Sequence, residues 1–157
     1  MTAQIAIEIT QLGPDETAQL HDLLALFGDA FEEPETYNDK RPDDTYIEKL
    51  LTGNTCIVLT ARLDGAVLGG LIAYELPKFE QKRSEIYIYD LAVAQSSRRR
   101  GVATALIERL QRIAAERGAW VVFVQADHGD DPAISLYTKL GVREDVLHFD
   151  IDVPRGD

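Results

Sequence analysis

Cysteine is almost absent from this sequence, and its scarcity excludes several kinds of site. Cys56 is the only one among 157 residues, so an intramolecular disulfide framework and a cysteine-rich zinc site are both excluded. The apolar run 55–59 around it predicts a buried strand, and therefore a packed thiol rather than a nucleophile. The three histidines, His21, His128 and His148, show no metal-ligand spacing.

Positive charge and long apolar runs are also scarce. The chain has 16 lysines and arginines against 27 aspartates and glutamates, a formal net charge of -11. Nucleic acid and anionic membranes are therefore poor partners and a cationic substrate is a better one, although an acidic balance also serves solubility alone. No apolar run is long enough to cross a bilayer, and residues 1–4 lack the pattern of a secretion signal, so we expect a cytoplasmic protein.

What is present is typical of a soluble α/β protein. Apolar residues make up 45% of the chain, and its length suits one domain with a hydrophobic core. Strand and helix patterns alternate without an internal repeat or linker, so we expect a single domain over residues 1–157. The expected strands are 5–9, 55–61, 66–74, 84–93, 120–126 and 146–151, and the expected helices are 17–28, 43–51, 102–117 and 131–141.

Three shorter segments have local signals of their own. Asp64-Gly65 predicts a hairpin turn, and Gly69-Gly70 inside a strand pattern predicts a bulge or a close backbone approach. Residues 29–42 begin with a cluster of carboxylates and have no helical periodicity. A solvated loop is the default interpretation of this segment, and a cation-binding loop is the alternative.

The most informative stretch is a strand, a turn and a helix in succession. β-branched and aromatic residues predict a strand over 84–93, and a helical stripe begins at Val102. In the turn between them, Gly101 and Ala103 let the backbone approach a bulky anion, and the N–H groups of the first helical turn point at it. Three arginines, 98–100, lie in the same turn. The turn is therefore predicted to cradle a pyrophosphate.

The next strand and helix extend this unit. The apolar run 120–126 is predicted to lie parallel to 86–93, because a strand, helix, strand unit makes a right-handed crossover. A short helix over 131–141 has an aspartate cap, a proline in its first turn and a closing glycine.

Two motifs in these elements resemble the signatures of a known family. Arg98-x-x-Gly101-x-Ala103, between a strand and a helix, resembles the acetyl-CoA motif of the GNAT acetyltransferases. A second hallmark of that family is a polar residue followed by alanine three positions on, tyrosine seven positions on, and a closing glycine. In this chain these residues are Asp130, Ala133, Tyr137 and Gly141. The family usually has asparagine at the first of these positions, so Asp130 is a departure.

Within that superfamily, the chain resembles the type I aminoglycoside 3-N-acetyltransferases, the enzymes behind gentamicin and fortimicin resistance. The similarity is dense from about residue 73 onward, whereas the N-terminal part matches mainly by pattern. The segments that carry it are 76–81, 83–93, 124–127, 129–133 and 136–141.

This resemblance implies both a fold and an activity. The fold is a mixed central sheet of about six or seven strands, with a splayed parallel pair and about four helices. The activity is transfer of an acetyl group from acetyl-CoA to the 3-amino group of an aminoglycoside, by direct attack in a ternary complex and without a metal. The resemblance also implies a homodimer.

The same resemblance implies which residues hold the cofactor. The backbone of Leu91, Ala92 and Val93 would hold the pantetheine arm, with an N–H near Leu91 or Ala92 receiving the developing oxyanion. The pyrophosphate would lie on the turn at the start of the following helix. The remaining cofactor-binding candidates are Arg98, Arg99, Arg100, Gly101, Val102, Ala103, Thr104, Asp130 and Ala133.

Three residues are the candidates for proton transfer. Asp90 is the first choice as base, directly or through water, because burial at the end of an apolar strand favours a raised pKa. His128 is its alternative. Tyr137 is the favoured general acid for the departing thiolate. Without the resemblance, a salt-bridged aspartate and a core tyrosine are the ordinary interpretations of these positions.

An aminoglycoside carries several ammonium groups, so its binding site needs carboxylates that pair with cations at short range. Asp131 has the alternative role of a helix cap. The candidates for substrate binding are Asp127, Asp130, Asp131, Glu32, Glu33 and Glu85. Two other functions use the same cofactor site: acetylation of a polyamine or a peptide amine, and non-catalytic sensing of coenzyme A.

Overall fold

The chain forms two compact units. A computed structural model describes residues 6–156. One unit comprises Met1–Gln125 and the other Ala126–Asp157. The first unit contains the whole sheet and most of the helices, and the second contains one helix and the C-terminal segment.

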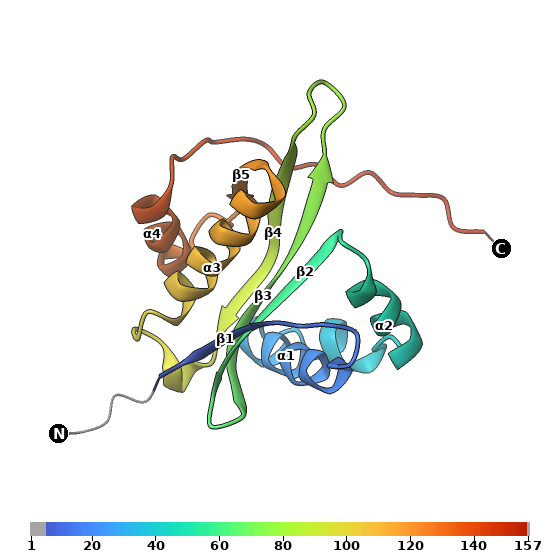
Figure 1. Cartoon of the computed structure of the whole chain (residues 1–157), viewed down its shortest axis with the longest axis vertical. Helices are drawn as coiled ribbons and strands as arrows, with labels where there is room; N and C mark the ends of the chain where they lie inside the picture. The colour runs from blue at the N-terminus through green and yellow to red at the C-terminus, as the bar shows by residue number, and fades with distance from the viewer. Residues whose placement is uncertain (1–5, 157) are drawn as a thin grey trace. The chain divides into compact units, whose positions relative to one another are not determined.

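A five-stranded mixed sheet is the frame of the first unit (Figure 1). Its strands lie in chain order, and every neighbouring pair is antiparallel except the last, which is parallel as predicted. The strands are β1 (Glu8–Gln11), β2 (Cys56–Leu63), β3 (Ala66–Pro77), β4 (Ser84–Val93) and β5 (Ala119–Val124).

Local signals in the sequence mark the start of the second long helix and the end of the third, whereas the first continues past Gly28 to Ala30. Asp43 caps the second helix by accepting a hydrogen bond at 2.9 Å from the backbone N–H of Tyr46. Gly118 ends the third in the left-handed conformation that glycine adopts without strain. The helices are α1 (Thr17–Ala30), η1 (Glu35–Asp39), α2 (Asp44–Thr52), η2 (Gln95–Ser97), α3 (Val102–Arg117) and α4 (Asp131–Leu140).

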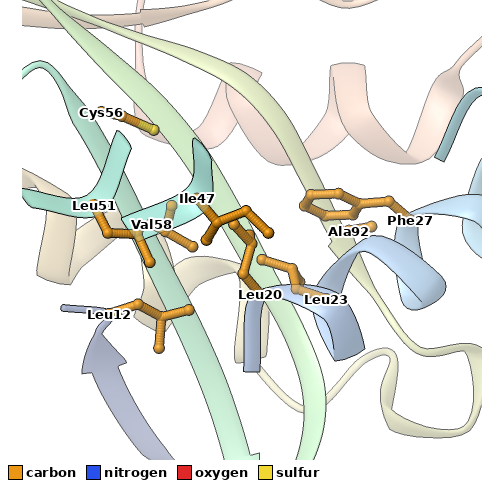
Figure 2. Packing of buried hydrophobic residues seen from close by; sticks show 9 residues of the cluster. All are labelled: Leu12, Leu20, Leu23, Phe27, Ile47, Leu51, Cys56, Val58 and Ala92. Atoms are coloured by element: carbon orange, nitrogen blue, oxygen red, sulfur yellow. The ribbon is translucent and has the colours of Figure 1, made fainter. Parts of the chain in front are cut away.

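Helices cover both faces of the sheet (Figure 1). α1 and α2 pack on one face, where their apolar side chains join those of β2 and β4 in a buried cluster (Figure 2). α3 buries its apolar stripe on the other face, as the spacing from Val102 predicts. The cluster on the first face consists of Leu12, Leu20, Leu23, Phe27, Ile47, Leu51, Cys56, Val58 and Ala92.

The predicted close approach at the paired glycines is confirmed. A Cβ atom on Gly70 would lie 2.6 Å from the Leu59 carbonyl oxygen and 2.6 Å from Leu23 Cδ1, and one on Gly69 would lie 2.9 Å from the Ala92 carbonyl oxygen. The register of β2 and β3 also shifts next to Gly69, between Ala61 and Arg62. These glycines let α1 and β4 pack closely on β3.

Three sequence predictions about the elements need correction. Residues 146–151 alternate in polarity but form no strand, and Val146 and Ile151 are 69% and 88% exposed. Alternation shows only which side chains share a face, and a strand also needs a partner for its backbone groups. The first strand is Glu8–Gln11, not 5–9, and residue 5 lies outside the described residues. The acidic segment 29–42 contains the helical turn η1.

No helix in the described part of the chain is long and apolar enough to cross a membrane.

Candidate active site

The parallel strands β4 and β5 part halfway along β4. Their register runs from Ser84 opposite Ala119 to Ile88 opposite Val124. β4 continues to Val93, and over those last residues its registered partner in the described chain is β3 alone. One edge of β4 is therefore open to a ligand from Tyr89 onward, as far as the first unit is concerned.

The backbone direction at this open edge follows from one hydrogen bond. The Ala94 N–H donates to the Leu68 carbonyl on β3 at 2.7 Å. In an antiparallel pair the residues that bond to one neighbour alternate along the strand, so the N–H of Ala92 also points toward β3. The N–H groups of Leu91 and Val93 then point away from β3, toward the open edge. Consistently, the Val93 carbonyl accepts a hydrogen bond from Arg98 Nε at 3.2 Å.

The turn after β4 suits a bulky anion. Arg99 and Gly101 both have positive φ, +63° and +77°, and such left-handed residues orient successive N–H groups toward one side. The first helical bond recorded in α3 runs from the Ala105 N–H to the Gly101 carbonyl at 3.0 Å, so the N–H groups of residues 102–104 precede the helical ladder. A Cβ atom on Gly101 would meet nothing within 4 Å. The turn therefore has the donors and the space that a diphosphate needs.

A β-bulge decides where Asp90 points. In the pairing of β3 and β4, Ile72 faces Asp90 and Ala73 faces Ile88, so Tyr89 is an extra residue. Without that residue, Asp90 would share the α3 face with Ile88, which is 2% exposed. With it, Asp90 lies on the face of α1, beside Ile72, which packs against the α1 cluster.

Asp90 is half-buried and has one recorded hydrogen bond. The Tyr37 hydroxyl donates to Asp90 Oδ2 at 3.0 Å. Burial raises the pKa of Asp90 above its ordinary value, the hydrogen bond from Tyr37 lowers it, and the nearby Glu33 carboxylate raises it. The net direction is upward. The pKa of Tyr37 is also raised, chiefly by burial and next by the charge of Asp90. The tyrosine therefore stays a hydrogen-bond donor at neutral pH.

Aromatic side chains border Asp90 on the same face. Tyr74 on β3 contacts the exposed Tyr89 edge to face, with the ring centroids 5.9 Å apart. Tyr89 contacts Tyr87 at the same separation, and the Tyr87 hydroxyl donates to Gln125 Oε1 at 2.7 Å. Aromatic faces next to a carboxylate favour a cationic ligand with apolar ring edges.

Three of the carboxylates predicted to bind the substrate lie in the first unit, and they differ in their surroundings. Glu33 is exposed and close enough to Asp90 to raise its pKa. Glu32 is exposed and has a left-handed backbone, with φ of +56°. Glu85 lies on β4 and pairs with Lys78 Nζ at 3.7 Å, which offsets its charge.

The second unit contains the other predicted residues. Asp130, not Asp131, caps α4: its Oδ1 accepts from the Ala133 N–H at 3.3 Å, and Asp131 is the first helical residue. The sequence prediction placed the cap one residue late because both aspartates precede the proline. Burial raises the pKa of Tyr137, and Asp130 adds to the shift. Asp127 accepts the Asp130 N–H at its backbone carbonyl, at 3.2 Å, in the turn that contains His128.

Cys56 is a buried free cysteine on β2. Burial raises the pKa of its thiol to about 11, so the thiolate is scarce at neutral pH. The prediction of a packed thiol is confirmed. Among residues 6–156, no group of three or more His, Cys, Asp or Glu side chains could hold a metal ion.

Tyr37 is the residue of this site that the sequence did not reveal. It lies in the acidic segment and contacts an aspartate 53 positions away. The only local signal is an aromatic residue within an otherwise polar stretch, which is equally typical of a loop that packs on the core.

The amino-acid sequence of this chain matches the model of a known protein family. A sequence model described as the Acetyltransferase (GNAT) family matches residues 20–142.

Solved structures with the same fold match nearly the whole chain. An aminoglycoside acetyltransferase from an uncultured soil metagenomic sample is 57% identical, with a TM-score of 0.93 over 95% of this chain and 99% of that one. A second such enzyme from soil metagenomic DNA, solved in complex with sisomicin, is 32% identical, with a TM-score of 0.87 over 94% and 97% of the two chains. The ribosomal-protein-alanine N-acetyltransferase of Brucella melitensis biovar Abortus 2308 is 28% identical, with a TM-score of 0.74 over 95% and 100%.

Proposed function

Because the chain belongs to the GNAT acetyltransferase family, we propose that it transfers an acetyl group from acetyl-CoA to the 3-amino group of an aminoglycoside. The observation that carries this proposal is the half-buried Asp90 carboxylate at the open edge of β4, next to a turn suited to a diphosphate. The aminoglycoside acetyltransferases at 57% and 32% identity support the substrate class. Antibiotic resistance is the physiological role that this activity implies.

The cofactor would be held by the backbone at the end of β4 and by the turn after it. Leu91 and Val93 present N–H groups at the open edge. Residues 102–104 present further N–H groups, and the arginines at 98–100 are exposed. Acetyl-CoA supplies the acetyl thioester that the amine attacks. In this arrangement the Leu91 N–H, rather than that of Ala92, is the donor for an acetyl oxygen.

Asp90 is the proposed base. The ammonium group of the substrate must lose a proton before its nitrogen can attack, and a carboxylate with a raised pKa accepts that proton more readily than an ordinary aspartate. The proton moves to a carboxylate oxygen directly or through water. Asp90 is ionised above its raised pKa, and the ionised carboxylate is the form that accepts the proton.

Tyr137 is the proposed acid. Its raised pKa keeps the hydroxyl protonated at neutral pH, so it can donate to the sulfur that leaves. Asp130 and Ala133 at the start of α4 are proposed to help hold the cofactor. Glu33 and Glu32, together with Asp127 and Asp131, are proposed to pair with the remaining ammonium groups of the substrate, and Glu85 is a further candidate.

A direct assay tests the proposed function. Purified protein is mixed with acetyl-CoA and sisomicin or gentamicin, free thiol is measured, and the acetylated nitrogen is located by NMR of the product. Thiol release with acetylation at the 3-amino group supports the proposal. Acetylation of another amino group would support an aminoglycoside as the substrate and would contradict the 3-amino group as the site of transfer.

The second candidate function is acetylation of a peptide amine or a polyamine. The 28% identity to a ribosomal-protein-alanine N-acetyltransferase favours the peptide form of this alternative. Turnover with an alanine-terminated peptide or with spermidine, but with no aminoglycoside, would establish it. Tight binding of coenzyme A without turnover on any of these amines would instead indicate a sensor.

We further propose a cytoplasmic homodimer. After α4, the C-terminal segment exposes several large apolar side chains, among them Leu147 at 83% and Phe149 at 77%. Exposed apolar groups of this kind are typical of surfaces that associate. Sedimentation at micromolar concentration tests the dimer, and a monomer at that concentration would contradict it.

A further inference from the structure

Asp90 is held by a residue from a distant part of the chain. Tyr37 donates its hydroxyl to Asp90 Oδ2 at 3.0 Å from η1, which follows α1, whereas Asp90 lies on β4. This contact leaves Asp90 Oδ1 without a recorded partner among the described residues. The two oxygens of the carboxylate are therefore not equivalent.

The position of the Tyr37 hydroxyl is set by packing. The Tyr37 ring packs against two aromatic residues of the α1 region that also stack on each other, with centroids 5.9 Å from Phe27 and 5.6 Å from Phe31. Its backbone carbonyl accepts from Arg41 Nε at 3.3 Å, and its N–H donates to the Glu33 carbonyl at 3.3 Å. Close packing of η1 on α1 adds to this, because a Cβ atom on Gly28 would lie 3.5 Å from Tyr37 Cβ.

The groups around Asp90 act on it in opposite senses. Burial and the Glu33 carboxylate raise its pKa, and the hydrogen bond from Tyr37 lowers it. Burial raises the pKa values of Tyr74 on β3 and Tyr87 on β4, and the charge of Asp90 adds a smaller contribution to both shifts. Of these groups, Tyr37 is the one with a recorded hydrogen bond to the carboxylate, and a hydrogen bond to the charged form favours that form.

We propose that Tyr37 is a positioning residue for Asp90: its hydroxyl holds Oδ2, so that Oδ1 faces the substrate ammonium group and takes its proton. This inference rests on the proposed function of Asp90 as the base. In the step, an N–H bond of the ammonium breaks, the nitrogen keeps the electron pair, and the proton forms a bond with Oδ1, directly or through one water. η1 is thus part of the active site, and the segment is not a solvated loop.

Tyr37→Phe tests this role, because it removes the hydroxyl and keeps the ring that packs on Phe27 and Phe31. We expect kcat/KM for the amine to fall about tenfold near neutral pH, since a hydrogen bond to a charged group is lost. We also expect the acid limb of the pH profile to move to higher pH, and the KM for acetyl-CoA to stay unchanged. A uniform loss of rate with no movement of the limb would reduce Tyr37 to a packing role and overturn the proposal.

A double-variant cycle shows whether Tyr37 acts through Asp90. If it does, Tyr37→Phe adds little to the loss caused by Asp90→Asn, because the carboxylate that it positions is already gone. Fully additive losses would overturn the proposal. Tyr46→Phe is the matched control, because Tyr46 is an exposed tyrosine on α2, 60% accessible, and the same substitution there leaves the pH profile unchanged.

A measurement without turnover separates this inference from the proposed function. The Asp90 carboxyl carbon is titrated by NMR in the wild type and in Tyr37→Phe, with Asp90→Asn used to assign the signal. A higher pKa in Tyr37→Phe supports the contact, and identical titrations overturn it. If the wild type acetylates no amine while this titration shifts, the proposed function fails and the Tyr37 contact stands.

Discussion

Asp90 combines properties that a structural aspartate does not need. It is half-buried, its pKa is raised by burial, and its hydrogen-bond partner is a tyrosine rather than a cationic side chain. An aspartate retained for stability is usually paired with a positive charge, which lowers its pKa. The opposite direction here is typical of a carboxylate that exchanges protons during a reaction.

Asp90→Asn is expected to lower turnover by about 10² or more, as for the loss of a positioned base. In the wild type, the rate falls as the pH drops through the raised pKa of Asp90, because protonation removes the base. This acid limb lies above the ordinary aspartate range and is absent from the residual activity of the variant. Initial rates between pH 4 and pH 9, at saturating acetyl-CoA, provide the measurement, with ~10 mM buffers matched in ionic strength.

Asp64→Asn is the matched control for this substitution. Asp64 is exposed in the turn between β2 and β3 and has a left-handed backbone that asparagine also tolerates. Its turnover stays at the wild-type value. Unchanged turnover in Asp90→Asn would remove Asp90 from the mechanism.

Tyr137→Phe is expected to slow the reaction by about 10² as well, since it removes the proton donor for the leaving sulfur. The ring stays in place, so the melting temperature changes little. Stopped-flow measurement of the thiol released in one turnover reports the chemical step. A single-turnover rate equal to that of the wild type would make Tyr137 a packing residue.

At the scale of elements, the start of α3 is where local geometry and the proposed cofactor binding coincide. β4 ends at Val93, and η2 with the turn from Arg98 to Gly101 leads the chain into the helix. The Arg98 side chain links this turn to the end of β4, because its Nε donates to the Val93 carbonyl. The same turn thus contacts the end of the strand and leads into the first turn of the helix.

Gly101→Ala is expected to weaken coenzyme A binding. A Cβ atom there would occupy space that is empty in the structure and that the proposed diphosphate needs, and φ of +77° would cost about 1 kcal/mol of stability. Gly118→Ala, at the other end of α3, is the control, because Gly118 has nearly the same φ, +74°, and equally open surroundings.

Calorimetry with coenzyme A and thermal unfolding separate the two effects. Both variants lose similar stability, and only Gly101→Ala loses affinity, by about tenfold for one displaced charge-assisted contact. Equal affinities in the two variants would place the diphosphate elsewhere.

At the scale of the whole molecule, charge acts over two ranges. The net charge of -11 attracts a cationic substrate from a distance, whereas the arginines at 98–100 act on an anion only at contact. An acidic protein with a local basic turn can therefore bind a polycation and a polyanion at the same time.

Salt is expected to raise the KM for the aminoglycoside while kcat stays constant. The Debye length falls from about 30 Å at 0.01 M salt to about 8 Å at 0.15 M, so long-range attraction weakens over that interval. The titration is run with potassium chloride at saturating acetyl-CoA, so that cofactor binding does not contribute. A KM independent of salt would contradict a carboxylate-lined substrate site.

Much of the frame was predictable because its signals are local. Asp43 caps α2, Asp64-Gly65 turns the β2–β3 hairpin, and Gly101 and Gly118 bound α3. Each of these depends on the conformational range of one residue or on a hydrogen bond to a near neighbour. The parallel order of β4 and β5 follows from the crossover helix between them.

The environment of Asp90 was less predictable because it depends on contacts between distant segments. The bulge at Tyr89 changes the face that Asp90 occupies, and it arises from the register of β4 against β3. The missing strand at 146–151 has the same cause, since its alternation is present and no backbone partner is recorded for it in the described chain.

The amino-acid sequence alone determined the order of the five strands, the turn suited to a diphosphate and the candidacy of Asp90, because each is written in residues within a few positions of one another. The tertiary structure decided that Asp90 lies on the α1 face and that Tyr37 donates to it, because strand register and the packing of η1 on α1 bring together residues 53 positions apart. Side-chain pattern specifies which faces are buried, and only packing specifies which side chains meet.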